Sequence, residues 1–333
     1  LGRAYSLGAT SYEDDESARA EISSLNNYLY VTAQKMLVEN EDWGAVVDYK
    51  VLTRENEPSF NLDLTTSLYR AGKKWSLDYF ETIYEKLGTD FDFYYFESKA
   101  GEVGFQKVMD HVDDGVFKKD QGAIIFEGEK YGLHTRVFVN SKGLPVYEAK
   151  DLGLATIKND DYKYDRSFII TANEVDDYFR VVLKAMEFVD EDLANKTTHI
   201  GHGMLVFKHG KMSSRTGDII SAEELLDNIG KKVKQKTEET LPEEMIEAVA
   251  VSSIKYSILK NGIGNDVVYD EEEATNLIGN TGPYLLYTYA RTGSVLRKAG
   301  LGRDEDGSAV IAHYDKELGD LSEAELSVLR HIY

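Results

Sequence analysis

The sequence of 333 residues has no cysteine, and it contains only four prolines and two tryptophans. Without cysteine no disulfide can form, and the thiolate ligands that dominate structural zinc sites are missing. No apolar run approaches the ~18 residues needed to cross a membrane. The first residues, Leu1-Gly2-Arg3-Ala4-Tyr5, lead into an acidic segment and do not resemble a signal peptide. We therefore expect a cytoplasmic protein with no membrane contact.

Positive charge is scarce as well, because 38 Lys and Arg face 59 Asp and Glu and the net charge is −21. This balance argues against a protein coated with nucleic acid, but it leaves room for a local phosphate-binding surface. Between Met204 and Lys236 the balance reverses, with seven basic residues against four acidic ones. Hydrophobic residues make up 42% of the sequence, which predicts a globular chain long enough for two domains.

Strand and helix patterns alternate in the first two thirds of the chain. Helix-spaced apolar residues mark 16–38, 77–87 and 174–189. Apolar runs predict strands at 91–96, 123–126, 135–139 and 167–170. The alternation indicates an α/β domain with a largely parallel sheet. From about residue 222 helices dominate, and we expect them at 222–238, after Pro242, at 270–279 and at 283–299, with the start of another in the last twenty residues.

The most informative local feature is a basic, glycine-flanked run, Gly210-Lys211-Met212-Ser213-Ser214-Arg215-Thr216-Gly217. It follows an apolar run at 203–207 that predicts a strand, and it precedes a capping box, Ser221-Ala222-Glu223-Glu224, that opens a helix. The mobile charge of Lys211 and the hydroxyls of Ser213 and Ser214 suit the binding of phosphate. The alternative for a stretch of this composition is an ordinary solvated turn.

Three polar residues are further candidates for a binding site. Tyr147 and Asp151 are four residues apart, so they share a face if this segment is a helix. Asp151 could then accept a bidentate contact from a guanidinium, although such a pair taken alone is more often a surface pair. Glu97 ends an apolar run, a frequent ligand position in open α/β sheets, while a helix start at Ser98 is an equal alternative.

Several segments together resemble arginyl-tRNA synthetases, and the resemblance extends over nearly the whole chain in the order of that family. The basic run is similar to Lys-Met-Ser-Lys-Ser, the second signature of class I aminoacyl-tRNA synthetases. The other matching segments are Phe96-Glu97-Ser98, Asp120-Gln121-Gly122-Ala123, Lys130-Tyr131-Gly132-Leu133, Tyr147-Glu148-Ala149-Lys150-Asp151-Leu152, Gly203-Met204, Asn280-Thr281-Gly282-Pro283-Tyr284 and Tyr287-Thr288-Tyr289-Ala290-Arg291.

The resemblance implies a fold and a set of partners. The fold would be α/β, with a partial Rossmann-type class I catalytic domain over 1–221 and an incomplete all-α anticodon-binding bundle over 222–333. The partners would be L-arginine, ATP and tRNA(Arg), with Mg²⁺ on the ATP phosphates and no metal site in the protein itself. The activity would be that of an arginine–tRNA ligase, and we expect a monomer.

The resemblance also assigns roles to particular residues. The arginine-binding residues would be Glu97, Tyr147 and Asp151. The ATP-binding residues would be Gly203, Met204, Leu205, Lys211 and Met212. The catalytic residues would be Lys211, Ser213 and Ser214. The tRNA-binding residues would be Tyr287 and Arg291, with the lysines of 231–236 nearby.

Three departures from the family pattern matter. Where the family commonly has Glu-Gln-x-x-His-Phe, this chain has Glu174-Val175-Asp176-Asp177-Tyr178-Phe179, so Val175 replaces a substrate-site glutamine. Ser214 stands where many class I enzymes have a second lysine. The histidine signature of the first strand-to-helix turn is absent.

The string His199-Ile200-Gly201-His202 spells that signature, but it lies nine residues ahead of Lys211 and we expect it before a strand, so we interpret it as a coincidence. We therefore expect a piece of a longer synthetase that is inactive by itself. One alternative is a non-catalytic synthetase-like protein that binds RNA or a protein partner. The other is a different class I nucleotidyl transferase.

Overall fold

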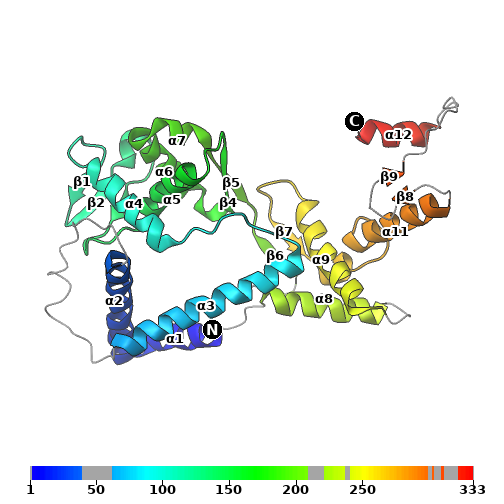
Figure 1. Cartoon of the computed structure of the whole chain (residues 1–333), viewed down its shortest axis with the longest axis horizontal. Helices are drawn as coiled ribbons and strands as arrows, with labels where there is room; N and C mark the ends of the chain where they lie inside the picture. The colour runs from blue at the N-terminus through cyan, green and yellow to red at the C-terminus, as the bar shows by residue number, and fades with distance from the viewer. Residues whose placement is uncertain are drawn as a thin grey trace.

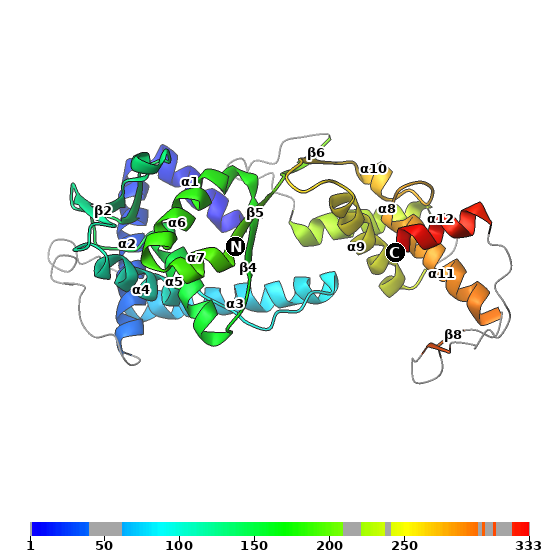
Figure 2. The same ribbon diagram turned by 90° about the horizontal axis from the view of Figure 1, so that it is seen from above.

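Two groups of elements joined by one long helix make up the part of the chain that the structure, a computed structural model, describes. The described residues are 2–39, 62–208, 221–236, 241–298, 302–303, 309–310 and 322–332. The long helix is α3 (Leu62–Leu87), which contacts α2 (Glu16–Glu39) and α9 (Glu243–Leu259) (Figure 1). α1 (Gly2–Asp14) packs against α2, and the view from above shows α3 reaching from one group to the other (Figure 2). None of the described helices is long and apolar enough to cross a membrane.

The first group encloses a core between helices and a small sheet. Its helices are α4 (Glu97–Asp110), α5 (Tyr147–Asp161), α6 (Asp176–Val189) and α7 (Glu191–Lys196), with short 3-10 turns at Gly128–Tyr131 and Asn173–Val175. The sheet has the order β1-β2-β3, with β1 at Lys118–Asp120, β2 at Ala123–Phe126 and β3 at Arg136–Val139. Fully buried apolar side chains from both layers meet in this core: Val108, Phe117, Phe126, Phe138, Val181, Val182 and Met186. The strands expected at 123–126 and 135–139 are confirmed.

Four of the described strands pair in parallel, as expected, while β1 to β3 and the short strands at 302–303 and 309–310 pair antiparallel. β4 (Ser167–Ala172) pairs in parallel with β5 (Thr197–His202), and β6 (Leu205–Phe207) pairs in parallel with β7 (Val267–Tyr269). β1, β2 and β3 are antiparallel instead. The reason lies in the loop between β1 and β2, where Gln121 and Gly122 have φ of 47° and 82°. A two-residue loop with positive φ at both positions turns a chain straight back into an antiparallel hairpin.

The strand expected at 91–96 is absent, because this segment is extended but pairs with no strand among the described residues. Its aromatic rings pack instead against α3 and against each other, with ring centroids 4.8 Å apart for Tyr84 and Phe91 and 6.1 Å apart for Phe91 and Tyr94. Glu97 therefore does not end a strand. It is the first residue of α4, directly after the N-cap Phe96.

The second group is helical around a smaller core. α8 (Ala222–Lys236) packs on α9, and α11 (Gly282–Lys298) packs on α9 from another side. Ser221 caps α8 as predicted, since its Oγ accepts a hydrogen bond from the Glu224 amide at 3.1 Å. The buried core residues are Leu225, Leu226, Ile229, Val233, Ile246, Ala250, Tyr269 and Ala274, with Leu205 and Phe207 of β6 packed against them. The remaining described elements are β8 (Gly302–Arg303), β9 (Ala309–Val310) and α12 (Glu323–Ile332).

The helix expected at 270–279 is one short turn, α10 (Glu271–Ala274). Asp270 starts it by accepting hydrogen bonds from the amides of Glu272 and Glu273. Beyond the turn the Asn276 side chain accepts a hydrogen bond from the Ile278 amide, and Gly279 has a φ of +97°. Both features are those of a turn, so the helix cannot continue.

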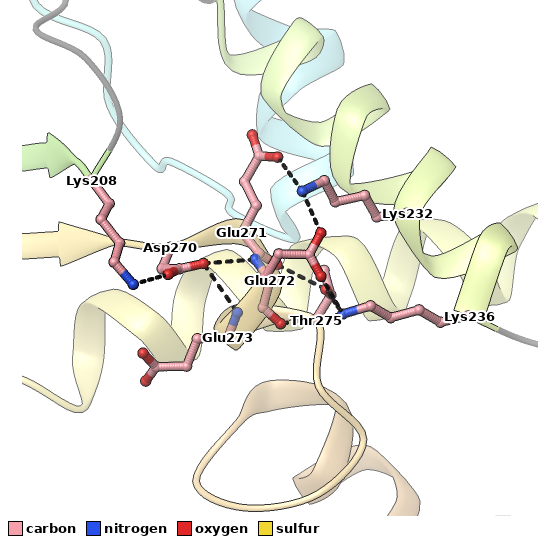
Figure 3. Close-up of polar contacts among 8 residues, drawn as sticks. All are labelled: Lys208, Lys232, Lys236, Asp270, Glu271, Glu272, Glu273 and Thr275. Atoms are coloured by element: carbon pink, nitrogen blue, oxygen red, sulfur yellow. Dashed lines mark hydrogen bonds and ion pairs between the residues drawn. The ribbon is translucent and has the colours of Figure 1, made fainter.

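Ion pairs connect this short turn to β6 and to α8 (Figure 3). Lys208, the residue after β6, lies 2.6 Å from Asp270 Oδ2. Hydrogen bonds from Lys208 and from the backbone lower the pKa of Asp270 to about 2. Lys232 lies 3.0 Å from Glu271 and 2.8 Å from Glu272, and Lys236 lies 3.1 Å from Glu272. Much of the positive charge expected at 204–236 is therefore matched by carboxylates that are close in space but distant in sequence.

Candidate functional site

Two helices that cross in close contact bring the predicted site residues together. α4 and α5 meet through Gly104 and Gly153. A Cβ on Gly104 would lie 1.7 Å from the Ala149 carbonyl oxygen, and a Cβ on Gly153 would lie 1.9 Å from that of Ala100. Only glycine permits this approach of two backbones. The crossing places Glu97, at the start of α4, beside the first turns of α5.

At the start of α5 a lysine connects two of the predicted residues. The Lys150 ammonium lies 2.7 Å from Glu97 Oε2 and 4.9 Å from the centroid of the Tyr147 ring. The Lys150 side chain is only 15% exposed, whereas Glu97 is 62% exposed and Tyr147 is 63% exposed. The Glu97 carboxylate and the Tyr147 ring thus already hold the Lys150 ammonium between them, and both remain exposed to solvent. Such a pair of groups is suited to binding a cationic ligand.

Asp151 lies one turn further along α5 and is less exposed. Burial raises the pKa of Asp151, and the nearby carboxylates of Glu148 and Glu97 raise it further. A hydrogen bond from Tyr178 and the charge of Lys150 act in the opposite direction. Because Glu97 acts on the pKa of Asp151, the two carboxylates belong to one electrostatic site. A cation bound between them would relieve their mutual repulsion.

The sequence predicts Glu97, Tyr147 and Asp151 for this site, and the structure brings all three together. Sequence reasoning missed three residues that complete it, Lys150, Tyr178 and Arg136. Tyr178 OH donates a hydrogen bond to Asp151 Oδ2, and the Arg136 guanidinium lies 5.2 Å from the Tyr178 ring centroid. These contacts join α5, α6 and β3, and the Tyr178–Asp151 contact spans 27 positions of sequence. The available signal was the tyrosine at 178, where the resembled family commonly has histidine.

A second predicted site lies at the junction of β5 and β6. A Cβ on Gly203 would lie 1.9 Å from the Asn265 carbonyl oxygen, so the chain passes close to the segment before β7. Met204 donates its amide to Asp266 Oδ1 at 2.8 Å and accepts the Val267 amide at 2.8 Å. Leu205 packs against the second core. The Met204 side chain remains exposed.

The basic run predicted to handle phosphate lies outside the described residues. This applies to Lys211, Met212, Ser213 and Ser214. Their roles stay predictions. The run begins just after Lys208, which is held by Asp270 at the end of β7. The strand β6 that leads toward the run is thus anchored after its last residue by this ion pair.

As expected, the two histidines come before a strand, β6, and they themselves belong to β5. His199 Nε2 lies 2.8 Å from Thr171 Oγ1, and its ring stacks on Phe179 with centroids 4.1 Å apart. Burial lowers the pKa of His199. His202 Nδ1 lies 2.8 Å from the Gly203 carbonyl oxygen. His199 thus has the contacts of a core residue, and within the described ranges no three His, Asp or Glu side chains are placed to hold a metal ion.

The pair predicted to bind tRNA shares one face of α11. Arg291 Nη1 donates a hydrogen bond to Tyr287 OH at 2.9 Å, and both side chains are exposed. The opposite face has the helical spacing of apolar residues that would predict packing into a core, but the described chain does not bury it. Its four apolar residues are all exposed: Leu285, Leu286, Tyr289 and Leu296. The reason is that α11 buries only Gly282 and Pro283 and then runs beyond α9 (Figure 1).

Comparison with known sequences identifies related proteins. A family profile described as "tRNA synthetases class I (R), catalytic domain" matches residues 6–270. The arginine–tRNA ligase of Flavobacterium psychrophilum is 31% identical over 276 residues, which are 80% of this chain and 46% of that protein. The arginine–tRNA ligase of Treponema denticola is 28% identical over 279 residues, 81% of this chain and 47% of that protein. The chain thus spans about half the length of these relatives.

Solved structures show the same fold. Arginyl-tRNA synthetase from Plasmodium falciparum superposes with a TM-score of 0.60 at 18% identity, covering 80% of this chain and 46% of that one. Arginyl-tRNA synthetase from Thermus thermophilus superposes with a TM-score of 0.58 at 19% identity, covering 74% of this chain and 50% of that one. At these identities the likeness concerns the fold, an α/β class I catalytic domain continued by helices.

Proposed function

Because the chain belongs to the arginyl-tRNA synthetase family of class I, we propose that its α4–α5 site binds L-arginine for an arginine–tRNA ligase. The observation that carries the proposal is that Glu97 and the Tyr147 ring hold the Lys150 ammonium between them, with Asp151 one turn further along α5 and Glu97 close enough to raise its pKa. A guanidinium is a planar fork of five donors that pairs with carboxylates and stacks on aromatic rings. L-Arginine presents this group together with an α-ammonium, so it can use both carboxylates.

In the proposed reaction an oxygen of the arginine carboxylate attacks the α-phosphorus of ATP. The bond from the α-phosphorus to the bridging oxygen breaks and pyrophosphate leaves, giving arginyl-adenylate. A hydroxyl of the terminal ribose of tRNA(Arg) then attacks the arginyl carbonyl, and AMP leaves. No protein nucleophile takes part, because positioning and charge stabilisation suffice for this in-line transfer. Met204 would contact the adenine, and Lys211, Ser213 and Ser214 would hold the leaving pyrophosphate.

The described residues offer no cluster of ligands for a metal ion. We propose that Mg²⁺ is bound by the ATP phosphates, as part of the substrate. The division into a catalytic part over 1–221 and a helical part over 222–333 stays a proposal. Two separate cores support it, although Leu205 and Phe207 pack with the second core. A monomer in the cytoplasm remains our expectation for the protein.

Calorimetric titration of the chain with L-arginine tests the proposed site. We expect L-arginine to bind and L-citrulline, its neutral isostere, to bind at least about tenfold more weakly, since the half-buried Asp151 carboxylate would be left without its charged partner. Lys211→Ala should weaken ATP binding and leave L-arginine binding unchanged. Equal affinities for L-arginine and L-citrulline would show that the two carboxylates do not recognise a guanidinium.

We further propose that tRNA docks on the α11 face that carries Tyr287 and Arg291. A tyrosine can stack on an unpaired base and an arginine can meet phosphate, and here their mutual hydrogen bond orients both. The lysines of 231–236 are a weaker candidate, because Lys232 and Lys236 are already paired with Glu271 and Glu272.

Arg291→Ala is accordingly expected to weaken tRNA binding about tenfold at low salt and to flatten its dependence on salt. The control is Arg297→Ala, which removes an exposed arginine from a different face of the same helix. The measurement is tRNA affinity in a filter-binding salt series. If Arg291→Ala binds tRNA like the unmodified chain at every salt concentration, tRNA docks elsewhere.

A further inference from the structure

Tyr178 is not a predicted arginine ligand, but it contacts the carboxylate of one, Asp151. Its hydroxyl, on α6, donates a hydrogen bond to Asp151 Oδ2 on α5. Among the described residues no hydrogen bond is made to the other oxygen, Oδ1. We propose that Tyr178 is a positioning residue that fixes the Asp151 carboxylate by one oxygen and thereby presents the other to the guanidinium of L-arginine. This inference rests on the proposed function of the site.

The Tyr178 ring is itself held in place by its neighbours. The Arg136 guanidinium lies 5.2 Å from the ring centroid, and Arg136 Nη1 is in turn 3.2 Å from Glu148 Oε1. The ring of Phe179 meets that of Tyr178 edge-on, with centroids 4.9 Å apart and an interplanar angle of 87°. A hydroxyl on a ring held in this way has little freedom to follow a moving carboxylate. Asp151 is therefore oriented before the substrate arrives, which reduces the cost of ordering the site on binding.

The same hydrogen bond also acts on the charge of Asp151. Burial raises the pKa of this carboxyl, and so do Glu148 on α5 and Glu97 on α4. Tyr178 on α6 and Lys150 on α5 lower it, and Lys158, further along α5, also interacts with Asp151. Burial and the charge of Asp151 raise the pKa of Tyr178, so the phenol stays protonated and remains a donor. Tyr178 thus helps to keep Asp151 ionised, the form that a guanidinium requires.

The test compares Tyr178→Phe with Tyr164→Phe. Phenylalanine keeps the ring between Arg136 and Phe179 and removes only the hydroxyl. Tyr164 is the matched control, because its hydroxyl also donates a hydrogen bond, to the Ala155 carbonyl oxygen at 3.2 Å, but not to Asp151. L-Arginine affinity is measured by calorimetry at about pH 6 and about pH 8, and the titration of the Asp151 carboxyl is followed by carbon-13 NMR, assigned with Asp151→Asn.

For Tyr178→Phe we expect L-arginine binding about tenfold weaker, with the larger loss at the lower pH. The sign follows from the lost donor, because without it the pKa of Asp151 rises and more of the carboxyl is neutral at the lower pH. Tyr164→Phe should bind L-arginine like the unmodified chain at both pH values. A loss that is equal at both pH values would indicate a merely structural role and would overturn the proposal.

The NMR titration separates this inference from the proposed function. If the Asp151 pKa is the same in Tyr178→Phe and in the unmodified chain, Tyr178 does not position Asp151, whatever the site binds. If the Asp151 pKa rises in Tyr178→Phe but the unmodified chain fails to bind L-arginine, the proposed substrate is wrong while the Tyr178–Asp151 coupling stands.

Discussion

Asp151→Asn is expected to weaken L-arginine binding about tenfold to a hundredfold, corresponding to roughly 1.5–3 kcal/mol for a hydrogen bond to a charged group. The substitution keeps the size and the acceptor oxygen of the side chain but removes its charge. Asp151 is half-buried, and Tyr178 donates a hydrogen bond to one of its oxygens. Water can therefore compensate for the lost charge less readily here than at an exposed position. Glu97→Gln should have the smaller effect, because Glu97 is 62% exposed and already neutralised by Lys150.

Asp160→Asn on the same helix is the matched control. Asp160 is 66% exposed, and its carboxylate pairs with Lys163 at 3.0 Å. Exposed pairs of this kind contribute little, so L-arginine binding should not change. Calorimetric titration of the three variants decides the matter. L-Arginine binding by Asp151→Asn at the affinity of the unmodified chain would remove Asp151 from the site.

Gly104→Ala is expected to lower the free energy of unfolding by about 3 kcal/mol, at the upper end of the range for overpacked sites. The new Cβ would lie 1.7 Å from the Ala149 carbonyl oxygen, a backbone atom that cannot turn aside. α4 and α5 must therefore separate. Because their crossing places Glu97 beside Tyr147 and Asp151, the variant should also bind L-arginine more weakly.

Gly101→Ala, one turn earlier in α4, provides the control. A Cβ there would lie 3.4 Å from Pro145 Cγ, an ordinary contact with a side chain. Alanine is favoured over glycine inside a helix by about 1 kcal/mol, so this variant should be as stable as the unmodified chain or slightly more stable. Urea unfolding followed by circular dichroism measures both. Equal stabilities of Gly104→Ala and Gly101→Ala would show that the two helices do not depend on this close approach.

The structure also shows why local sequence patterns succeeded for some elements and failed for others. The strands at 123–126 and 167–170 and the capped helix after Ser221 were predictable, since their signals lie within a few residues. The segment 91–96 has the composition of a strand, but a strand exists only when another strand pairs with it. Its rings pack on α3 instead. The apolar face of α11 has helical spacing too, yet its burial depends on a neighbour, and α9 reaches only its first turn.

The sequence by itself determined the family, the order of the motifs and the three proposed arginine ligands, because these are properties of residue identity and spacing. Tyr147 and Asp151 share a helix face by periodicity alone. Only the tertiary structure decided what surrounds them. Lys150 pairs with Glu97 across the α4–α5 crossing, and Tyr178 reaches Asp151 from α6. These two contacts join residues that are 53 and 27 positions apart in the sequence. Whether such residues meet in space depends on how the helices pack, which local spacing does not determine.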